Sequence, residues 1–503
     1  MGHAEIGSVN DSSDTFQGTP YYTIYKWNVS SALMNALEPD AMSLGNHEFD
    51  DGVEGLAPFL VNVNFPVLAC NLDLYGEDLL ENEENLKPSV IFERNGYKIG
   101  VIGYVTPETR FLAAPSDVIF LDEIQAVDKE AKRLKSKGVE ILIALGHSGH
   151  EKDCIIAREV PDIDLVIGGH TNTFLWNGPK PPQGENPEGP YPKIIVQKSN
   201  KLVPVVQAYA YTKYIGKLRL QFNRNGELIR FHGQPIMLTS AVEQEKDILR
   251  IIDKYKPGVK AATSRVIGMT RVFLDGITCR IQECSLGNLL TDSMILEYIE
   301  RFGDNSSAMA LLNGGAIRSS ISKGKAGFVT MEALMTVLPF GNDLIIGQYT
   351  GKIIKEALEH SIHRYIPSTP YGEFLQMSGL RVSYNLSANP GNRVNSVQTF
   401  CEKCPEDYQD LDPTSTYNVV LNFFLSRGGD GYDMLRDKAL SKKNLGVDDL
   451  RAAEMYFKTR SPVWHGPDGR ISFLHDWRKS SATWKMTDFN IVLIAYVCII
   501  VLM

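Results

Sequence analysis

The chain has 503 residues, of which 43% are hydrophobic and 22% charged, a composition typical of globular proteins. Its 51 Lys and Arg residues stand against 60 Asp and Glu residues, which gives a net charge of −9. This charge disfavours non-specific binding to nucleic acid or to an anionic membrane surface. At about 100–200 residues per domain, the length indicates two domains or three.

The first 13 residues are mostly polar and small, and no strand pattern is visible in them. Residues 1–5 lack the basic and apolar regions of a secretory signal, and their Met-Gly start is only a weak myristoylation signal. Asp14 follows as a candidate metal ligand, with a helix N-cap or turn as the alternative. An apolar helix is expected around residues 32–37.

A short apolar run over residues 41–44 is typical of a buried strand, and it ends in Gly45-Asn46-His47-Glu48-Phe49-Asp50. Ligands of α/β proteins bind outside the carboxyl ends of strands, so polar groups here suit an active site. Asn46 offers an oxygen to a metal ion, and His47 and Asp50 are a candidate imidazole–carboxylate pair. Taken alone, this stretch is more typical of a capped turn.

Two later strands end in the same way. Residues 139–145 run into Gly146-His147, and residues 163–167 run into Gly168-Gly169-His170, with a helix expected over residues 122–137. Glycine lets the backbone turn tightly, and the histidine projects at the end of the strand. Three such strand ends predict a metal centre, because imidazole, amide and carboxylate ligands suit zinc or manganese. Two ions about 3.5–4 Å apart would activate a water and clamp a phosphate.

A boundary between two domains is expected in the middle of the chain. Residues 241–255 form a polar helical segment that we expect to be closed by Pro257. The segment would link the two halves. Beyond it, further helices are expected from Leu286, after Thr330 and over residues 352–365, with strands over residues 309–312 and 417–421.

The second half holds several side chains that suit recognition of a nucleotide. Arg280 and Arg318 are candidate ligands of a phosphate or carboxylate. Phe340 and Phe424 would stack a flat base, and Asp430 would accept a hydrogen bond from a ribose hydroxyl. Without the first half, the same residues would be read as two core phenylalanines and two surface arginines.

Four of the seven cysteines form close pairs, Cys279 with Cys284 and Cys401 with Cys404. They indicate either two local disulfides in an oxidising compartment or one four-thiolate zinc site. Glycosylation sequons stand at Asn10, Asn28, Asn305 and Asn385.

The C-terminal tail has the pattern of a glycosylphosphatidylinositol (GPI) attachment signal. Small residues at Ser480 and Ser481 are followed by a short polar spacer and by an apolar run to Met503. The uninterrupted run, residues 491–503, would span roughly 20 Å as a helix, short of the ~30 Å of a bilayer core. The alternative is a C-terminal membrane anchor. The preferred signal predicts an extracellular protein that is GPI-anchored at the cell surface.

In these motifs the chain resembles the 5′-nucleotidase family, the animal ecto-5′-nucleotidases in particular. The matching stretches keep the order of the family and are Asp14–Thr19, Gly45–Asp50, Ala144–Gly149, Gly168–Phe174, Cys279–Cys284, Asn313–Arg318, Leu338–Gly341 and Phe424–Gly431.

The resemblance implies an α/β fold with two domains. An N-terminal calcineurin-like metallophosphatase domain, a β-sandwich flanked by helices, would occupy residues 1–242. A linker helix over residues 243–264 would join it to a nucleotide-binding α/β domain over residues 265–478. The GPI-attachment signal would occupy residues 479–503. A homodimer is a further expectation from the family.

The resemblance also implies roles for individual residues. Two divalent ions, zinc by preference, would be bridged by Asp14, with further ligands from Asn46, His147 and His170. His47, oriented by Asp50, would stabilise the transition state. The substrate would be held by Arg280, Asn313, Arg318, Phe340, Phe424 and Asp430. The two cysteine pairs would be disulfides of the family.

The chain departs from the family at its start. The family begins with an apolar strand that ends in Asp-x-His and supplies two ligands to the first metal, but no such motif precedes Asp14. The sequence thus predicts a 5′-nucleotidase that hydrolyses extracellular AMP to adenosine and phosphate, with a shortened N-terminus. One alternative is an apyrase that acts on ATP and ADP. A second alternative is an inert surface protein that binds nucleosides.

Overall fold

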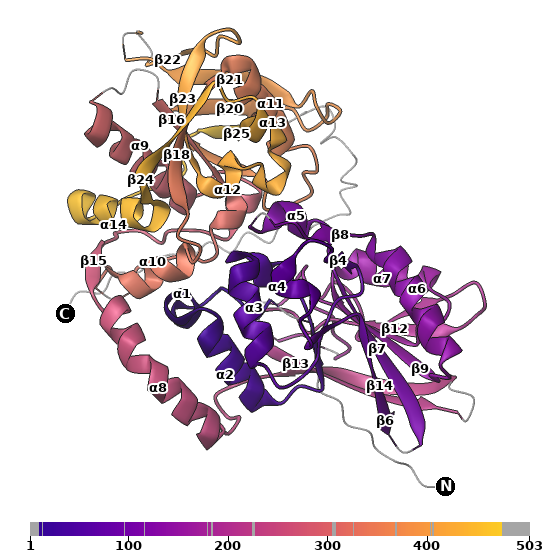
Figure 1. Ribbon diagram of the computed structural model, residues 1–503. Helices are drawn as coiled ribbons and strands as arrows, with labels where there is room; N and C mark the ends of the chain where they lie inside the picture. The colour runs from indigo at the N-terminus through magenta and orange to yellow at the C-terminus, as the bar shows by residue number, and fades with distance from the viewer. Residues whose placement is uncertain are drawn as a thin grey trace, which may run out of the picture.

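The computed structural model describes residues 10–12, 14–94, 96–114, 116–178, 180–182, 185–223, 227–303, 308–324, 326–367, 370–402, 404 and 407–474. Figure 1 shows two lobes, with the N-terminal half in indigo to magenta and the C-terminal half in orange to yellow. The expected GPI-attachment signal and the sequon at Asn305 lie outside the described residues. Of the described helices, none combines the length and the apolar composition needed to cross a membrane.

The N-terminal lobe is a sandwich of two sheets. The central strands of the larger sheet have near-continuous apolar sequences, as expected for strands covered on both faces. The larger sheet has the order β11 (Lys193–Val196), β12 (Leu202–Val206), β10 (Leu165–Ile167), β9 (Ile141–His147), β7 (Tyr97–Val105), β6 (Ser89–Arg94). The smaller parallel sheet has the order β1 (Asn10–Asp11), β2 (Ala41–Ser43), β3 (Val67–Leu68), β5 (Leu86–Lys87). Buried Ala41 and Leu68 of one sheet pack against Val101 and Leu145 of the other.

Helices cover both outer faces of the sandwich. The larger sheet is covered by α6 (Glu123–Ser136) and α7 (His150–Glu159), whose buried residues join its core. The smaller sheet is covered by α2 (Trp27–Leu37) and α3 (Gly52–Asn62). The predicted β-sandwich flanked by helices is therefore confirmed. Smaller elements of this lobe are α1 (Pro20–Tyr25), η1 (His47–Phe49), β4 (Leu72–Asp73), α4 (Asp78–Glu81), α5 (Thr109–Leu112), β8 (Ile119–Phe120), β13 (Tyr214–Phe222) and β14 (Leu228–Met237).

The expectation of no strand in the first 13 residues is wrong at one place. Asn10 and Asp11 form β1, which pairs in parallel with Ala41 and Met42 of β2. Backbone hydrogen bonds to a neighbouring strand do not require apolar side chains, so the polar sequence gave no sign of this strand. As a result, the chain enters Asp14 from the end of a strand.

The link between the lobes is α8 (Lys246–Thr263), which runs along one side of the molecule in Figure 1. The expectation that Pro257 closes this helix is wrong, because Pro257 lies inside it. Buried Tyr255 and Val259 hold this part of the helix against the protein, which offsets the hydrogen bond that proline cannot donate. Tyr255 donates its hydroxyl to Oδ1 of Asn28 at 2.6 Å, so α8 is tied to α2.

The C-terminal lobe is built on a five-stranded mixed sheet in the order β19 (Leu375–Ser378), β16 (Ala308–Asn313), β23 (Thr416–Asn422), β18 (Asp343–Thr350), β24 (Ser441–Asp448). One face packs against α9 (Ser285–Phe302), α10 (Met331–Val337) and α14 (Asp449–Arg460), and the other against α11 (Gly351–Ser361). The last of these helices ends four residues before the expected Tyr365.

The remaining elements of this lobe frame the large sheet. A second sheet has the order β22 (Tyr408–Asp410), β21 (Val394–Phe400), β20 (Leu380–Tyr384), β25 (Ile471–Phe473). Short elements are β15 (Val266–Met269), η2 (Thr278–Arg280), η3 (Gly314–Ala316), β17 (Phe328–Thr330), α12 (Phe423–Ser426), η4 (Gly429–Gly431) and α13 (Asp433–Asp437). The cysteine pairs form two disulfides, Cys279–Cys284 and Cys401–Cys404, rather than a four-thiolate zinc site.

Candidate metal and nucleotide site

The strand ends singled out in the N-terminal sequence meet at one edge of the sandwich. His147 is the last residue of β9, His170 follows β10, and Asp14 follows β1. One ligand atom from each of these three side chains lies within 4.8 Å of the others. In the described part of the chain, no other group of three His, Cys, Asp or Glu side chains meets this condition. Asp14, His147 and His170 therefore converge on one point. The N-cap alternative for Asp14 is wrong, because Thr19 caps the first helix.

The geometry of the cluster presents ring nitrogens to a shared point. Oδ2 of Asp14 lies 2.9 Å from Nε2 of His147. Nδ1 of His147 hydrogen-bonds the carbonyl oxygen of Ser12 at 2.7 Å, which leaves Nε2 to face the carboxylate. The rings of His147 and His170 are 5.1 Å apart between centroids.

The three side chains of the cluster shift the pKa values of one another. Burial opposes the charge on Asp14, but the neighbouring His147, His47 and His170 together outweigh burial and hold the pKa of Asp14 below its usual range. Burial also opposes protonation of His147, yet Asp14 raises the pKa of His147 to about 9. For His170, burial and the neighbouring His147 lower the pKa to about 3, so this imidazole is neutral and free to act as a ligand.

The donor set fits a divalent metal ion. Asn46 is 3% exposed, and its Oδ1 has no hydrogen-bond partner, which is costly unless a ligand meets it. Asp14 and His170 have φ values of 95° and 76°, a left-handed backbone that non-glycine residues adopt at a cost and often at functional sites. Two imidazoles, a carboxylate and an amide oxygen would suit one zinc-like or manganese-like ion.

Glu48 is part of this site, although sequence reasoning gave it no role. Its Oε1 accepts hydrogen bonds from the backbone N–H and hydroxyl of Thr15, at 2.7 and 3.0 Å, and from the N–H of Phe16 at 3.1 Å. Its Oε2 accepts from the N–H of Gly45 at 2.7 Å. The fully buried carboxylate thus ties the loop of Asp14 to the turn that follows β2. Burial and the nearby Asp14 raise the pKa of Glu48, and the hydrogen bonds from Gly45 and Phe16 oppose this shift.

His47 and Asp50 form the expected imidazole–carboxylate pair. Nδ1 of His47 lies 2.7 Å from Oδ2 of Asp50, and the N–H of His47 donates to Oδ1 of Asp14 at 3.1 Å. Burial alone would lower the pKa of His47, but Asp50 and Asp14 together outweigh burial, so the net shift is upward. A protonated His47 beside the metal cluster can donate a hydrogen bond to an anion.

The two lobes meet at His47. Its ring stacks on Phe340 of the C-terminal lobe, with 5.7 Å between centroids and 22° between planes. The guanidinium of Arg318 lies 5.8 Å from the centroid of the same phenylalanine. A second link joins Arg364 and Glu108, at 3.2 Å. The catalytic candidate of one lobe and the base-binding candidate of the other are therefore neighbours.

The remaining nucleotide-binding candidates line the carboxyl ends of β16 and β23. Asn313 donates to Oδ2 of Asp430 at 2.7 Å, and its own Oδ1 accepts from Asn422 at 3.1 Å. Burial and the nearby Glu373 raise the pKa of Asp430 to about 6. Gly429 lies flat against Phe424, because a Cβ on it would come within 2.5 Å of the ring. In the described part of the chain, Phe340 and Phe424 make no ring contact with one another.

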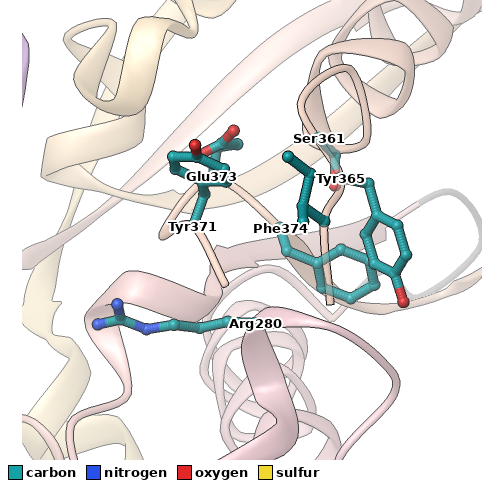
Figure 2. A pocket seen from close by; sticks show the side chains of 7 residues that line it. Arg280, Ser361, Tyr365, Tyr371, Glu373 and Phe374 are labelled. Carbon is teal, nitrogen blue, oxygen red and sulfur yellow. The ribbon is translucent and has the colours of Figure 1, made fainter. Parts of the chain in front are cut away.

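Arg280 stands at the rim of a small pocket in Figure 2, below Tyr371 and Glu373. Burial and the like charge of Arg318 lower the pKa of Arg280 to about 10. Among the described residues, neither arginine has an ion-pair partner within 4 Å, whereas Glu373 is paired with Arg364 at 3.0 Å. Two unpaired guanidinium groups close enough to repel one another are suited to bind a shared anion.

Sequence reasoning missed Glu48 and the Arg364 link because both depend on partners far away along the chain. Glu48 bonds residues 32 and 33 positions earlier, and Arg364 reaches a residue 256 positions away. The one available signal was the carboxylate inside Gly45–Asp50.

Comparisons with known proteins show which families the two lobes match. Residues 12–174 match the calcineurin-like phosphoesterase family, and residues 262–437 match the family described as 5′-nucleotidase, C-terminal domain. The 5′-nucleotidase of Bos taurus is 39% identical over 501 residues, which cover 98% of this chain and 86% of the relative. That of Homo sapiens is 41% identical over 471 residues, which cover 92% of this chain and 81% of the relative.

A solved structure of a 5′-nucleotidase precursor from Thermus thermophilus has the same architecture. Its TM-score is 0.86 at 34% identity, with 94% of this chain and 91% of that chain covered. Two domain families in the expected order, long alignments near 40% identity and the same fold therefore agree. The chain belongs to the 5′-nucleotidase family.

Proposed function

We propose that this chain hydrolyses nucleoside 5′-monophosphates, with AMP as the substrate, to a nucleoside and inorganic phosphate. The observation that carries the proposal is the position of His47. It lies against the Asp14 cluster on one side and stacks on Phe340 on the other. A phosphoryl group and a base held at these two places would belong to one nucleotide.

The metal ion is proposed to be zinc, held by Asp14, Asn46, His147 and His170. A divalent ion bound there would lower the pKa of a water and neutralise phosphoryl charge. We also propose that a second divalent ion binds, with Asp14 shared between the two ions, as the family resemblance implies. The described residues gather the donors for one of them.

The side chains of this chain have distinct tasks in the proposed reaction. His47, fixed by Asp50, would donate a hydrogen bond to a phosphoryl oxygen as negative charge develops, which lowers the barrier. Arg280 and Arg318 would hold the polar groups of the substrate and limit its motion.

The C-terminal lobe would select a nucleoside. Phe340 and Phe424 would stack the base, and Asp430, steadied by Asn313, would accept a ribose hydroxyl. Stacking holds a base of any identity, so these contacts favour a nucleotide over a simple phosphate ester without choosing among bases.

The site of action is proposed to be the extracellular face of the cell, with a GPI anchor attached near Ser480 or Ser481. This part of the proposal is supported by the small residues, spacer and apolar run of residues 479–503. The two disulfides are also typical of an oxidising compartment.

The proposal is tested by measuring phosphate release from AMP, ADP and ATP by the full chain with added zinc. AMP should be the preferred substrate, and His47→Ala should lower kcat by about 100-fold or more if the imidazole acts on the transition state. Activity on ATP and ADP with none on AMP would favour the apyrase alternative. Adenosine binding without turnover would favour the inert alternative.

A further inference from the structure

A buried chain of hydrogen bonds runs directly behind the metal-binding edge of the larger N-terminal sheet. Tyr104 of β7 donates its hydroxyl to Oδ1 of Asp153 at 2.7 Å, and Gln207 donates its amide to Oδ2 at 2.8 Å. Tyr104 and Asp153 are fully buried, and Gln207 is 3% exposed. Because both carboxylate oxygens accept a hydrogen bond, Asp153 is fixed between β7 and the end of β12, two strands that β9 and β10 separate in the sheet.

Gln207 extends this chain to the loop that carries His170. Its Nε2 also donates to the carbonyl of Gly169 at 2.9 Å, and its Oε1 accepts from the N–H of Thr173 at 3.0 Å. These contacts bracket His170 along the backbone. His170 has a φ of 76°, and such a conformation persists only when its surroundings hold it.

Two glycines allow the strand ends to pack directly against Asp153 and Tyr104. A Cβ on Gly168 would lie 1.8 Å from Oδ2 of Asp153. A Cβ on Gly146, the residue before His147, would lie 2.3 Å from the ring of Tyr104. A shift of Asp153 or Tyr104 would therefore displace the backbone that carries His147 and His170.

We propose that Tyr104, Asp153 and Gln207 together form a positioning element that sets the ligand geometry of the metal site. They touch neither metal nor substrate, and they act on His147 and His170 through the backbone of residues 146 and 168–173. This inference rests on the metal site put forward in the proposed function. Partners outside the ligand sphere of a metal typically change its affinity about 10–100-fold when they are removed.

The test compares Gln207→Leu with a matched control in the same domain, Gln197→Leu. Gln197 is also a buried glutamine, 5% exposed, whose Nε2 donates to the carbonyls of Ala157 and Val160, each at 2.9 Å. It contacts the far end of the helix that begins near Asp153. Both variants lose buried hydrogen bonds, and both should lower Tm.

Only the Gln207 variant should alter the metal site. Zinc affinity, measured on the full chain by competition with a chromophoric chelator, should fall about 10–100-fold. The visible spectrum of the cobalt-loaded protein should change, because it reports ligand geometry. The KM for AMP should change little, since the residues proposed to hold the nucleoside lie in the other lobe. Gln197→Leu should keep the wild-type zinc affinity and cobalt spectrum.

If Gln207→Leu does not fold, Tyr104→Phe decides the matter, because it deletes one oxygen atom and keeps the ring. Its zinc affinity should fall and its cobalt spectrum should change in the same direction. A wild-type chain that binds zinc, with Tyr104→Phe and any folded Gln207→Leu binding it equally well, would overturn this inference alone. A wild-type chain that binds no divalent metal would overturn the proposed function, and the inference with it.

Discussion

Replacing Glu48 by glutamine should destabilise the N-terminal domain and loosen the metal site. The carboxylate accepts four hydrogen bonds, three through Oε1 from Thr15 and Phe16 and one through Oε2 from Gly45. An amide of the same shape has one acceptor and one donor. In either orientation of the amide, its NH2 group faces at least one backbone N–H whose hydrogen bond is accepted by the carboxylate in the wild type.

The loss of unfolding free energy in this variant can be estimated from these contacts. A hydrogen bond to a charged group contributes about 1.5–3 kcal/mol, and a buried N–H left without a partner costs about 1–3 kcal/mol. For the milder orientation, in which only the Gly45 contact is lost, both ranges describe the same loss, which is about 1.5–3 kcal/mol. That is a large part of the about 5–15 kcal/mol by which domains are stable. The Asp14 loop loses its anchor at the same time, so zinc affinity should fall as well.

Urea unfolding in the presence of a chelator measures the unfolding free energy without a contribution from bound metal. Glu130→Gln is a suitable control, since Glu130 is also largely buried and accepts hydrogen bonds from Ser89 and Arg133 on the far side of the larger sheet. It should leave zinc affinity unchanged. An unfolding free energy of Glu48→Gln within about 1 kcal/mol of wild type would refute the reasoning.

Three further changes have defined outcomes. Gly45→Ala should abolish tight zinc binding, because its Cβ would lie 2.3 Å from a carboxylate oxygen of the metal cluster, whereas Gly466→Ala meets no atom within 4 Å and should be neutral. Phe340→Ala should raise the KM for AMP about 5–150-fold, the equivalent of ~1–3 kcal/mol of stacking; an unchanged KM would contradict this. Burial would raise the pKa of Asp292, but a neighbouring histidine and Arg470 lower it to about 2. The ionised Asp292 therefore stabilises the folded state by about 2–3 kcal/mol. This contribution is complete above roughly pH 4 and is lost as the pH falls toward 2. The unfolding free energy measured across this range should show the loss in wild type and not in Asp292→Asn.

The candidate site was predictable where a local pattern carries it. A strand followed by Gly and His specifies both a turn and a projecting ligand within a few residues, so three such patterns located Asn46, His147 and His170. The pairing of His47 with Asp50 was predictable for the same reason, since three residues separate them in a single turn. The architecture of the two lobes followed from the resemblance that these motifs carry.

The missed features depend on contacts between distant parts of the chain. Nothing near Asn10 predicts β1, because its backbone pairs with a strand about 30 residues later. Pro257 is a helix breaker by local rules, and only the packing of α8 against the first helices overrides that preference. Asp153 and Gln207 are separated by 54 residues, so their hydrogen bond leaves no pattern in the sequence.

The most direct test of the account is a crystal structure of the zinc-loaded chain with anomalous scattering measured at the zinc edge. The account predicts an anomalous peak coordinated by Asp14, Asn46, His147 and His170, beside the His47–Phe340 stack. The absence of a peak at these four residues, in a folded protein soaked with zinc, would contradict it.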